Sequence, residues 1–126
     1  MDECELIDDL IRYLGGEVVD FSGYEVDLSS LTDFERNVLC EARKIEYGSV
    51  VTYSELAARI GKPNAARAVG NALKKNPLPI VIPCHRVVSK GGIGGYAFGV
   101  EAKRRLLKLE NQNLENATTT AAHSDP

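Results

Sequence analysis

The pattern Thr-x-x-Glu, which occurs twice in this chain, fixes where two of its helices begin. It stands at residues 32–35 and 52–55. In such a capping box the Thr side chain accepts a hydrogen bond from the third helical N–H, and the Glu side chain accepts one from the Thr N–H. Apolar residues at helical spacing follow each box. We therefore predict a helix from residue 32 to about Tyr47-Gly48, and a short second helix that begins at residue 52.

A third helix is predicted from about Asn64 to Lys75, where small and apolar residues recur at helical spacing. The turn Gly61-Lys62-Pro63 separates it from the second helix. Two short helices joined by a Gly-containing turn outline a helix-turn-helix, whose second helix is the one offered to DNA. Many helical hairpins share this outline, so it does not by itself identify a DNA-binding protein.

The flanking segments carry weaker patterns. Apolar residues at helical spacing over residues 6–14 predict a short amphipathic helix that stops at Gly15-Gly16. Residues 17–26 are expected to form a small strand or hairpin. Residues 80–83, bounded by Pro, are expected to approach Cys84 as a rigid, extended chain.

A final helix is predicted from about Val100 to Glu110, and the tail after it lacks a core-forming pattern. We therefore divide the chain into an acidic N-terminal segment (1–31), a helix-turn-helix domain (32–112) and a disordered tail (113–126). The expected fold class is α+β and mainly helical.

Composition excludes several classes of protein. A chain of 126 residues with 44% hydrophobic residues is long enough for one self-sufficient core. Its apolar runs are too short to cross a bilayer and its acidic start is unlike a secretory signal, so we expect a cytoplasmic protein with no membrane partner. The three cysteines, Cys4, Cys40 and Cys84, are widely spaced and form no C-x-x-C motif. We therefore expect no disulfide scaffold, no metal and no cofactor.

The charges are strongly segregated along the chain. The overall net charge is -3, but residues 1–35 carry eleven acids and one base. Residues 59–108 carry eleven Lys or Arg against one acid, a net charge of +10. Such a one-sided segment attracts a polyanion, and the phosphate backbone of DNA is the commonest one in a cell. The alternative is a solvated basic face neutralised by the acidic N-terminus.

Cys84 is the candidate nucleophile. It follows Pro83 and precedes His85-Arg86. A neighbouring imidazole and guanidinium are expected to lower the pKa of a thiol. The alternative is a buried structural cysteine. Because adjacent residues of an extended chain point to opposite faces, Cys84 and His85 need a turn or a bridging water to act together.

Three further features are unusual. Glu110 is a carboxylate on the edge of a buried helix face at the helix C-terminus, where it needs a partner such as His, unless it is a frayed, exposed acid. Arg67 stands alone among small residues that would admit another backbone, although a tight helix pair with one surface Arg gives the same pattern.

Four glycines within residues 90–96 would let a planar ligand lie against bare backbone. The loop also matches a dinucleotide fingerprint, which we reject because no second βαβ strand can follow.

These pieces, in this order, resemble the C-terminal domain of the O6-alkylguanine-DNA alkyltransferases. Pro83-Cys84-His85-Arg86-Val87 matches the family motif PCHRV. The other matching motifs are Thr52-Tyr53-Ser54-Glu55-Leu56-Ala57, Ala66-Arg67-Ala68-Val69-Gly70, Asn76-Pro77, Gly94-Gly95-Tyr96 and Leu106-Leu107-x-x-Glu110. The match covers roughly residues 32–112 and implies a winged-helix-like alkyltransferase domain with a small N-terminal appendage.

The resemblance implies DNA repair by direct damage reversal. The protein would bind double-stranded DNA as a monomer, rotate an O6-alkylguanine out of the stack, and transfer its alkyl group irreversibly to Cys84. His85 would act on the thiol through a water, and Glu110 would orient His85. Tyr53 would donate a hydrogen bond to the guanine, and Asn76 would brace the turn that holds the nucleophile.

The resemblance also implies two sets of binding residues. Arg67 would fill the place that the extruded base leaves. The other DNA-binding candidates are Tyr53, Ser54, Lys62, Ala65, Ala66, Ala68, Gly70, Lys74 and Lys90. The candidates for the substrate pocket are Pro79, Val87, Gly95, Tyr96 and Ala97.

Two departures and two alternatives accompany this interpretation. Family members usually carry a larger N-terminal domain, and Ala97 stands where the family often has Ser. One alternative is a helix-turn-helix module that recognises alkylated or ordinary DNA without transfer, although relatives of that kind typically have Trp in place of Cys84. The other is a thiol hydrolase, for which the sequence supplies no activated water.

Overall fold

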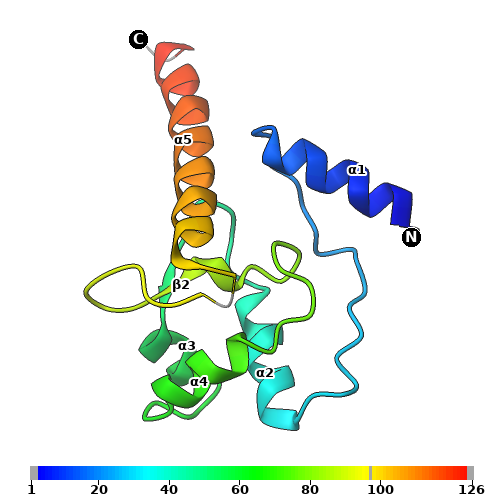
Figure 1. Ribbon diagram of the computed structural model, residues 1–126. Coiled ribbons are helices and arrows are strands. Elements are labelled where there is room, and N and C mark those ends of the chain that lie inside the picture. The colour runs from blue at the N-terminus through cyan, green and yellow to red at the C-terminus, as the bar shows by residue number, and fades with distance from the viewer. Residues whose placement is uncertain (1–2, 97, 125–126) are drawn as a thin grey trace.

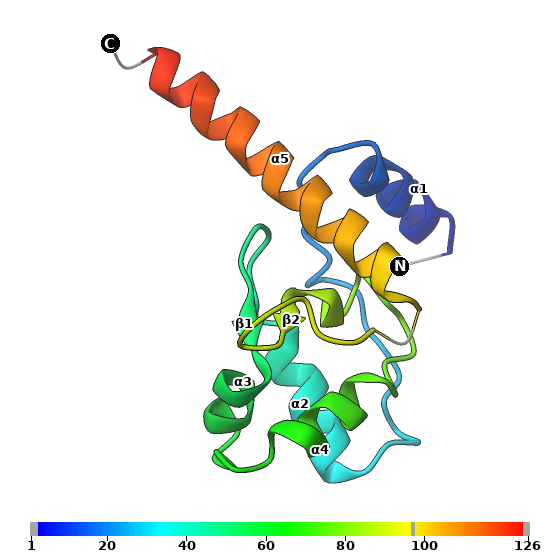
Figure 2. The same cartoon turned by 60° about the vertical axis from the view of Figure 1, so that its left-hand side comes forward.

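Three short helices pack against one another to form the main core (Figures 1 and 2). They are α2 (Asp33–Ala42), α3 (Tyr53–Arg59) and α4 (Ala66–Leu73). The computed structural model describes residues 3–96 and 98–124. Both predicted capping boxes are present, with Thr32 and Thr52 as the N-caps of α2 and α3. The side chains that fill this core are Val38, Leu39, Ala42, Leu56, Ala57, Val69, Ala72 and Leu73.

α2 ends earlier than its sequence pattern predicts. It stops at Ala42 instead of near Tyr47, because the next residues close two tight turns, Lys44 N–H to the Glu41 carbonyl and Ile45 N–H to the Ala42 carbonyl. These turns bury Ile45, which is only 4% exposed, in the same core. The helical spacing of apolar residues therefore extends past the end of α2, because Ile45 is buried by the turn that follows the helix.

A two-stranded parallel sheet links the helices to the segment around Cys84. β1 (Val51–Thr52) pairs with β2 (Val87–Val88), with Val51 opposite Val87. α3 begins directly after β1, and the 3₁₀ turn η1 (Cys84–Arg86) directly precedes β2. The pairing therefore brings Tyr53 and Cys84, which are distant in sequence, to the same place. Within the described residues, five α-helices and this small sheet confirm the predicted mainly helical α+β class.

The N-terminal segment forms a second core against the last helix. α1 (Glu3–Leu14) confirms the predicted first helix, and its residues pack with α5 (Val100–Ser124) around the buried Tyr13, Phe21 and Tyr24. The strand or hairpin predicted for residues 17–26 is wrong, since the described structure has only turns there. The Asp20 side chain accepts a hydrogen bond from Ser22 N, at 2.9 Å, so local bonds satisfy the backbone in place of a strand partner.

Two other predictions differ from the structure. Residues 80–83 are not extended, because Ile80 has φ = 76° and Ile82 N–H closes a turn onto the Leu78 carbonyl. α5 continues to Ser124, where the sequence predicted disorder from residue 113; residues 113–124 contain no Gly or Pro that would interrupt the helix. No helix within residues 3–96 and 98–124 is both long enough and apolar enough to cross a membrane.

Candidate active site

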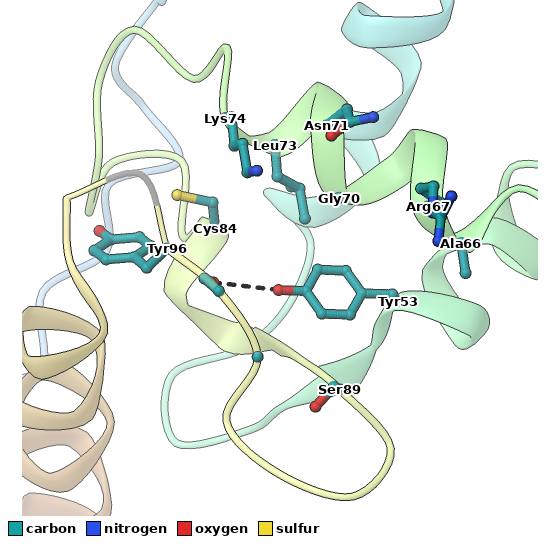
Figure 3. A pocket seen from close by; sticks show the side chains of 12 residues that line it. Tyr53, Ala66, Arg67, Gly70, Asn71, Leu73, Lys74, Cys84, Ser89 and Tyr96 are labelled. Atoms are coloured by element: carbon teal, nitrogen blue, oxygen red, sulfur yellow. Dashed lines mark hydrogen bonds between the residues drawn. The ribbon is translucent and has the colours of Figure 1, made fainter.

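A cavity of about 410 Å³ lies beside Cys84 (Figure 3). Its walls are the start of α3, one side of α4 and the glycine-rich loop after β2. The residues that line it are Tyr53, Ala66, Arg67, Gly70, Asn71, Leu73, Lys74, Cys84, Ser89, Gly94, Gly95 and Tyr96. Cys84 is only 5% exposed, so its thiol sits among protein atoms and still reaches the cavity.

Asn76 holds the turn that carries Cys84. Its Nδ2 donates to the Ile82 carbonyl at 2.8 Å and to Cys84 Sγ at 3.1 Å, and its Oδ1 accepts from Leu78 N at 2.9 Å. Asn76 itself is 5% exposed. One amide therefore fixes both the loop before the cysteine and the sulfur atom itself.

The pKa of Cys84 is shifted in the direction opposite to the sequence expectation. Burial raises the pKa of the thiol, and hydrogen bonds from Asn76 and Tyr96 lower it only in part. The expected lowering by His85 and Arg86 is wrong, because both side chains bind Glu110 instead of the sulfur. The thiol therefore needs a base to remove its proton during a reaction.

His85, Arg86 and Glu110 form a buried polar cluster behind the cysteine turn. His85 Nε2 and Glu110 Oε2 lie 2.7 Å apart. Arg86 donates to Glu110 twice, from Nε to Oε1 at 2.8 Å and from Nη2 to Oε2 at 2.9 Å. Burial alone would raise the pKa of Glu110, but the hydrogen bonds from His85 and Arg86 outweigh it and lower the pKa to about 2. Glu110 is therefore a carboxylate at neutral pH.

This arrangement fixes the tautomer of His85. Because ionised Glu110 can only accept, the proton of neutral His85 resides on Nε2 and donates to Oε2. Burial lowers the pKa of His85, with Glu110 opposing it, so the neutral ring is favoured. Nδ1 is then the basic nitrogen, and it is buried without a hydrogen-bond partner among the described residues. His85 thus presents a free proton-accepting atom.

Tyr13 and Lys103 are members of the site that sequence reasoning missed. Tyr13 Oη donates to Glu110 Oε2 at 2.5 Å. Lys103 Nζ donates to the carbonyls of Val87, at 2.6 Å, and Gly95, at 2.9 Å. Lys103 lies seven residues before Glu110 and so shares its helix face, a signal that the basic run around it concealed.

The loop after β2 is shaped around Tyr53. Tyr53 Oη donates to the Gly95 carbonyl at 3.2 Å. Gly94 has φ = 76°, and a Cβ there would lie 2.8 Å from Tyr53 Oη. Glycine is therefore required at residue 94 both for its backbone conformation and for the close approach of the Tyr53 ring.

The predicted pocket residues are only partly brought together. Gly95 and Tyr96 line the cavity, whereas Val87 and Pro79 are not among its lining residues. Val87 is fully buried in the main core, and Pro79 forms a bridge with Ile82. Ala97 lies outside the described residues.

The predicted DNA-contacting residues lie on α3, α4, the turn between them and the loop after β2. Arg67 and Ala68 are exposed on α4, and a Cβ at Gly70 would meet the Tyr53 ring at an ordinary 3.7 Å. Packing within the chain therefore does not require glycine at residue 70. The other exposed candidates are Ser54, Lys62, Lys74 and Lys90, whereas Ala65 and Ala66 are partly buried.

Comparisons with known proteins place the chain in a family. The family model described as 6-O-methylguanine DNA methyltransferase, DNA binding domain, matches residues 33–112. The methylated-DNA–protein-cysteine methyltransferase of Methanothermobacter thermautotrophicus is 45% identical over 112 residues, which cover 88% of this chain and 62% of that protein. The Haemophilus influenzae protein of the same name is 46% identical and covers 79% of this chain and 55% of its own length.

Two solved structures are similar in fold. One is Mycobacterium tuberculosis OGT in complex with DNA, with a TM-score of 0.79 and 40% identity over 87% of this chain and 68% of that one. The other is S. pombe Atl1 in complex with damaged DNA containing O6-carboxymethylguanine, with a TM-score of 0.54 and 31% identity over 68% of this chain and 79% of that one.

The family model covers more than half of the chain, and it includes every element around the cavity. The chain spans about 62% of the length of its relative from M. thermautotrophicus. The match extends from the first residue of α2 into α5. This chain belongs to the 6-O-methylguanine DNA methyltransferase family.

Proposed function

We propose that this chain repairs DNA by moving the alkyl group of an O6-alkylguanine onto Cys84 Sγ, once per molecule. The observation that carries the proposal is the position of Cys84 between two different surroundings. On one side it reaches a cavity of about 410 Å³, and on the other the turn that holds it continues into the buried His85–Glu110 pair. A nucleophile, a base and a place for substrate therefore adjoin one another.

The reaction follows from the chemistry of these groups. His85 Nδ1 accepts the thiol proton through a water, and the Sγ thiolate attacks the alkyl carbon. The S–C bond forms as the C–O6 bond breaks, and the electron pair leaves on the guanine, which finally takes up the proton. Tyr53 and Lys103, which both donate to the Gly95 carbonyl, would offset the negative charge that develops on the purine. A thioether has no good leaving group, so Cys84 is not regenerated.

The proposed partner is double-stranded DNA. The exposed bases Arg59, Lys62 and Arg67 form a basic face on α3, α4 and the turn between them, and the acid-rich α1 lies at the opposite end of the molecule, beside α5 (Figures 1 and 2). The small residues of α4 would allow a close approach of the duplex. Arg67, exposed at the rim of the cavity, would fill the space left by the extruded base. A single chain suffices, because cavity, base and basic face all belong to it.

A second candidate is a module that binds damaged DNA without transfer. The similarity to S. pombe Atl1 in complex with damaged DNA favours it. The raised pKa of the Cys84 thiol also favours it, because a protonated thiol is a weak nucleophile. The two functions predict different products from the same mixture.

Intact-mass spectrometry tests the proposal. After incubation with duplex DNA containing O6-methylguanine, we expect the mass of the chain to rise by one methyl group, located on Cys84 by peptide mapping. Cys84→Ala should abolish the change and still bind the duplex. Cys40→Ala is the matched control, because Cys40 is exposed and lies away from the cavity, and it should leave the transfer intact. Binding without a mass change would support the module, and repeated turnover would support a hydrolase.

A further inference from the structure

Tyr13 connects the N-terminal helix α1 to the base of the proposed reaction. Its side chain is fully buried, and its Oη lies 2.5 Å from Glu110 Oε2 and 3.5 Å from His85 Nε2. Tyr13 lies outside residues 33–112, the part of the chain that the family model matches. A segment outside the matched domain therefore completes its most buried polar cluster.

The two oxygens of Glu110 have different partners. Oε1 accepts from Arg86 Nε at 2.8 Å and from Gly48 N at 3.4 Å. Oε2 accepts from Arg86 Nη2, from Tyr13 Oη and from His85 Nε2. Tyr13 therefore donates to the same oxygen that accepts the hydrogen bond from His85 Nε2. Each donor to that oxygen takes up part of its negative charge and leaves less for the imidazole.

Tyr13 can act only as a donor here. Burial, with the nearby Glu110 carboxylate, raises the pKa of Tyr13 far above its usual value, so the phenol stays protonated. The other charged groups that face His85 and Glu110 are Arg86 from η1 and Lys103 from α5. Tyr47 faces Tyr13 from the segment after α2. Tyr13 is the member of this set that α1 supplies.

We infer that Tyr13 is a positioning residue for alkyl transfer: its hydroxyl holds Glu110 Oε2 toward His85 Nε2 and limits how strongly the carboxylate attracts a proton onto the imidazole. The inference rests on the proposed function for its catalytic meaning. It assigns to the N-terminal segment a part in setting the proton affinity of the base, in addition to covering the core.

Removal of the Tyr13 hydroxyl is expected to raise the proton affinity of the His85–Glu110 pair. In Tyr13→Phe the negative charge of Glu110 is shared with one donor fewer, so the His85–Glu110 pair binds a proton more tightly. We expect the titration midpoint of His85 to rise by about one pH unit. The ring should stay in place, because its edge-to-face contacts with Phe21 and Tyr47, at centroid distances of 5.9 and 6.0 Å, need no oxygen.

The control is Tyr24→Phe. Tyr24 is a buried tyrosine of the same aromatic cluster, and its Oη donates to Asp9 Oδ2 at 2.5 Å instead of to Glu110. The substitution Tyr24→Phe removes a phenolic hydroxyl from the same N-terminal segment. A general loosening of this segment would therefore affect both variants, whereas an effect on the base should follow Tyr13 alone.

The experiment measures His85 by ¹⁵N NMR in the DNA-free protein, and the pH dependence of single-turnover transfer from O6-methylguanine duplex. We expect both the His85 midpoint and the acid limb of the rate profile to move to higher pH in Tyr13→Phe and to stay unchanged in Tyr24→Phe. Equal midpoints in wild type and Tyr13→Phe would overturn the inference, as would an equal shift in Tyr24→Phe.

A second variant covers the case in which Tyr13→Phe does not fold. 3-Fluorotyrosine at position 13 keeps the hydroxyl and makes it a stronger donor, so the His85 midpoint should fall, and an unchanged or raised midpoint would contradict the proposal. The NMR measurement needs no DNA. If the wild-type protein transfers no alkyl group, the proposed function fails while the role of Tyr13 in setting the proton affinity of His85 is still decided.

Discussion

The two sides of Cys84 differ in how deeply their residues are buried. Behind the cysteine turn, His85, Glu110 and Tyr13 are at most 1% exposed and bound to one another. In front, the cavity is lined by residues that include Gly70, at which a Cβ would meet only the Tyr53 ring, and the exposed Arg67. The rear is therefore closed by contacts within the chain, whereas the front is an open cavity. Substitutions on the two sides should therefore have different consequences.

The largest effect is expected from Glu110→Gln. This substitution leaves the Arg86 guanidinium in a buried place without its counter-charge, which costs about 3–5 kcal/mol of the free energy of unfolding. Urea unfolding at pH 7 measures it. Glu101→Gln, on the same helix but at a side chain that is 65% exposed, is the control and should cost less than about 1 kcal/mol. Similar losses in the two variants would remove the distinction between the rear of the site and the surface.

Lys103 should impose a pH dependence on stability. Burial lowers its pKa from 10.5 to about 8, so between these values the unfolded chain binds more protons than the folded one. The contribution of Lys103 to the free energy of unfolding therefore rises with pH across this window, by at most about 1.4 kcal/mol per pH unit. Urea unfolding at pH 8 and pH 10 should reveal this slope as the difference between wild type and Lys103→Met, and parallel curves would contradict it.

Gly94→Ala tests whether the loop in front of the site is shaped around Tyr53. The positive φ and the contact with Tyr53 Oη should cost about 1–2 kcal/mol of stability and displace the Tyr53 ring. Gly95→Ala is the matched control, because a Cβ there meets nothing within 4 Å. Thermal unfolding compares the two variants. If Gly95→Ala were the more destabilised, the loop would not be built as described.

The smallest change in stability is expected from Gly70→Ala. A Cβ at this position fits beside Tyr53, and Ala favours the helix by up to about 1 kcal/mol relative to Gly. Stability should therefore stay unchanged or rise slightly. If α4 faces DNA, affinity for an alkylated duplex should fall in the same variant, as measured by fluorescence anisotropy. A large loss of stability would show that glycine serves the packing of this chain instead of a ligand.

Local signals in the sequence predicted the helices well. The capping boxes of Thr32 and Thr52 depend on hydrogen bonds between residues three apart, so they act wherever the segment lies in the fold. Residues 80–83 were mispredicted because their conformation depends on the side chain of Asn76, whose Nδ2 binds the Ile82 carbonyl. A contact of that kind leaves no periodic trace in the sequence.

The candidate site was predictable where residue types alone carry chemistry. Cys84, His85 and Glu110 stood out by their residue types and their positions in the sequence. The direction of the Cys84 pKa shift was mispredicted because it depends on burial in the folded protein, which the sequence does not show. Tyr13 was not singled out by the sequence pattern of the first helix. A buried tyrosine needs a partner for its hydroxyl, and that rule could have marked it as a residue to follow.

The seven-residue spacing of Lys103 and Glu110 on α5 sets the distance between the two groups that these side chains bind. Lys103 binds the carbonyl of Gly95 beside the cavity, and Glu110 binds His85 behind the cysteine turn. One helix therefore determines how far apart these two contacts lie. One residue inserted between them would swing Glu110 about 100° around the helix axis. Such an insertion would therefore separate Glu110 from His85 while Lys103 kept its bonds to the loop after β2.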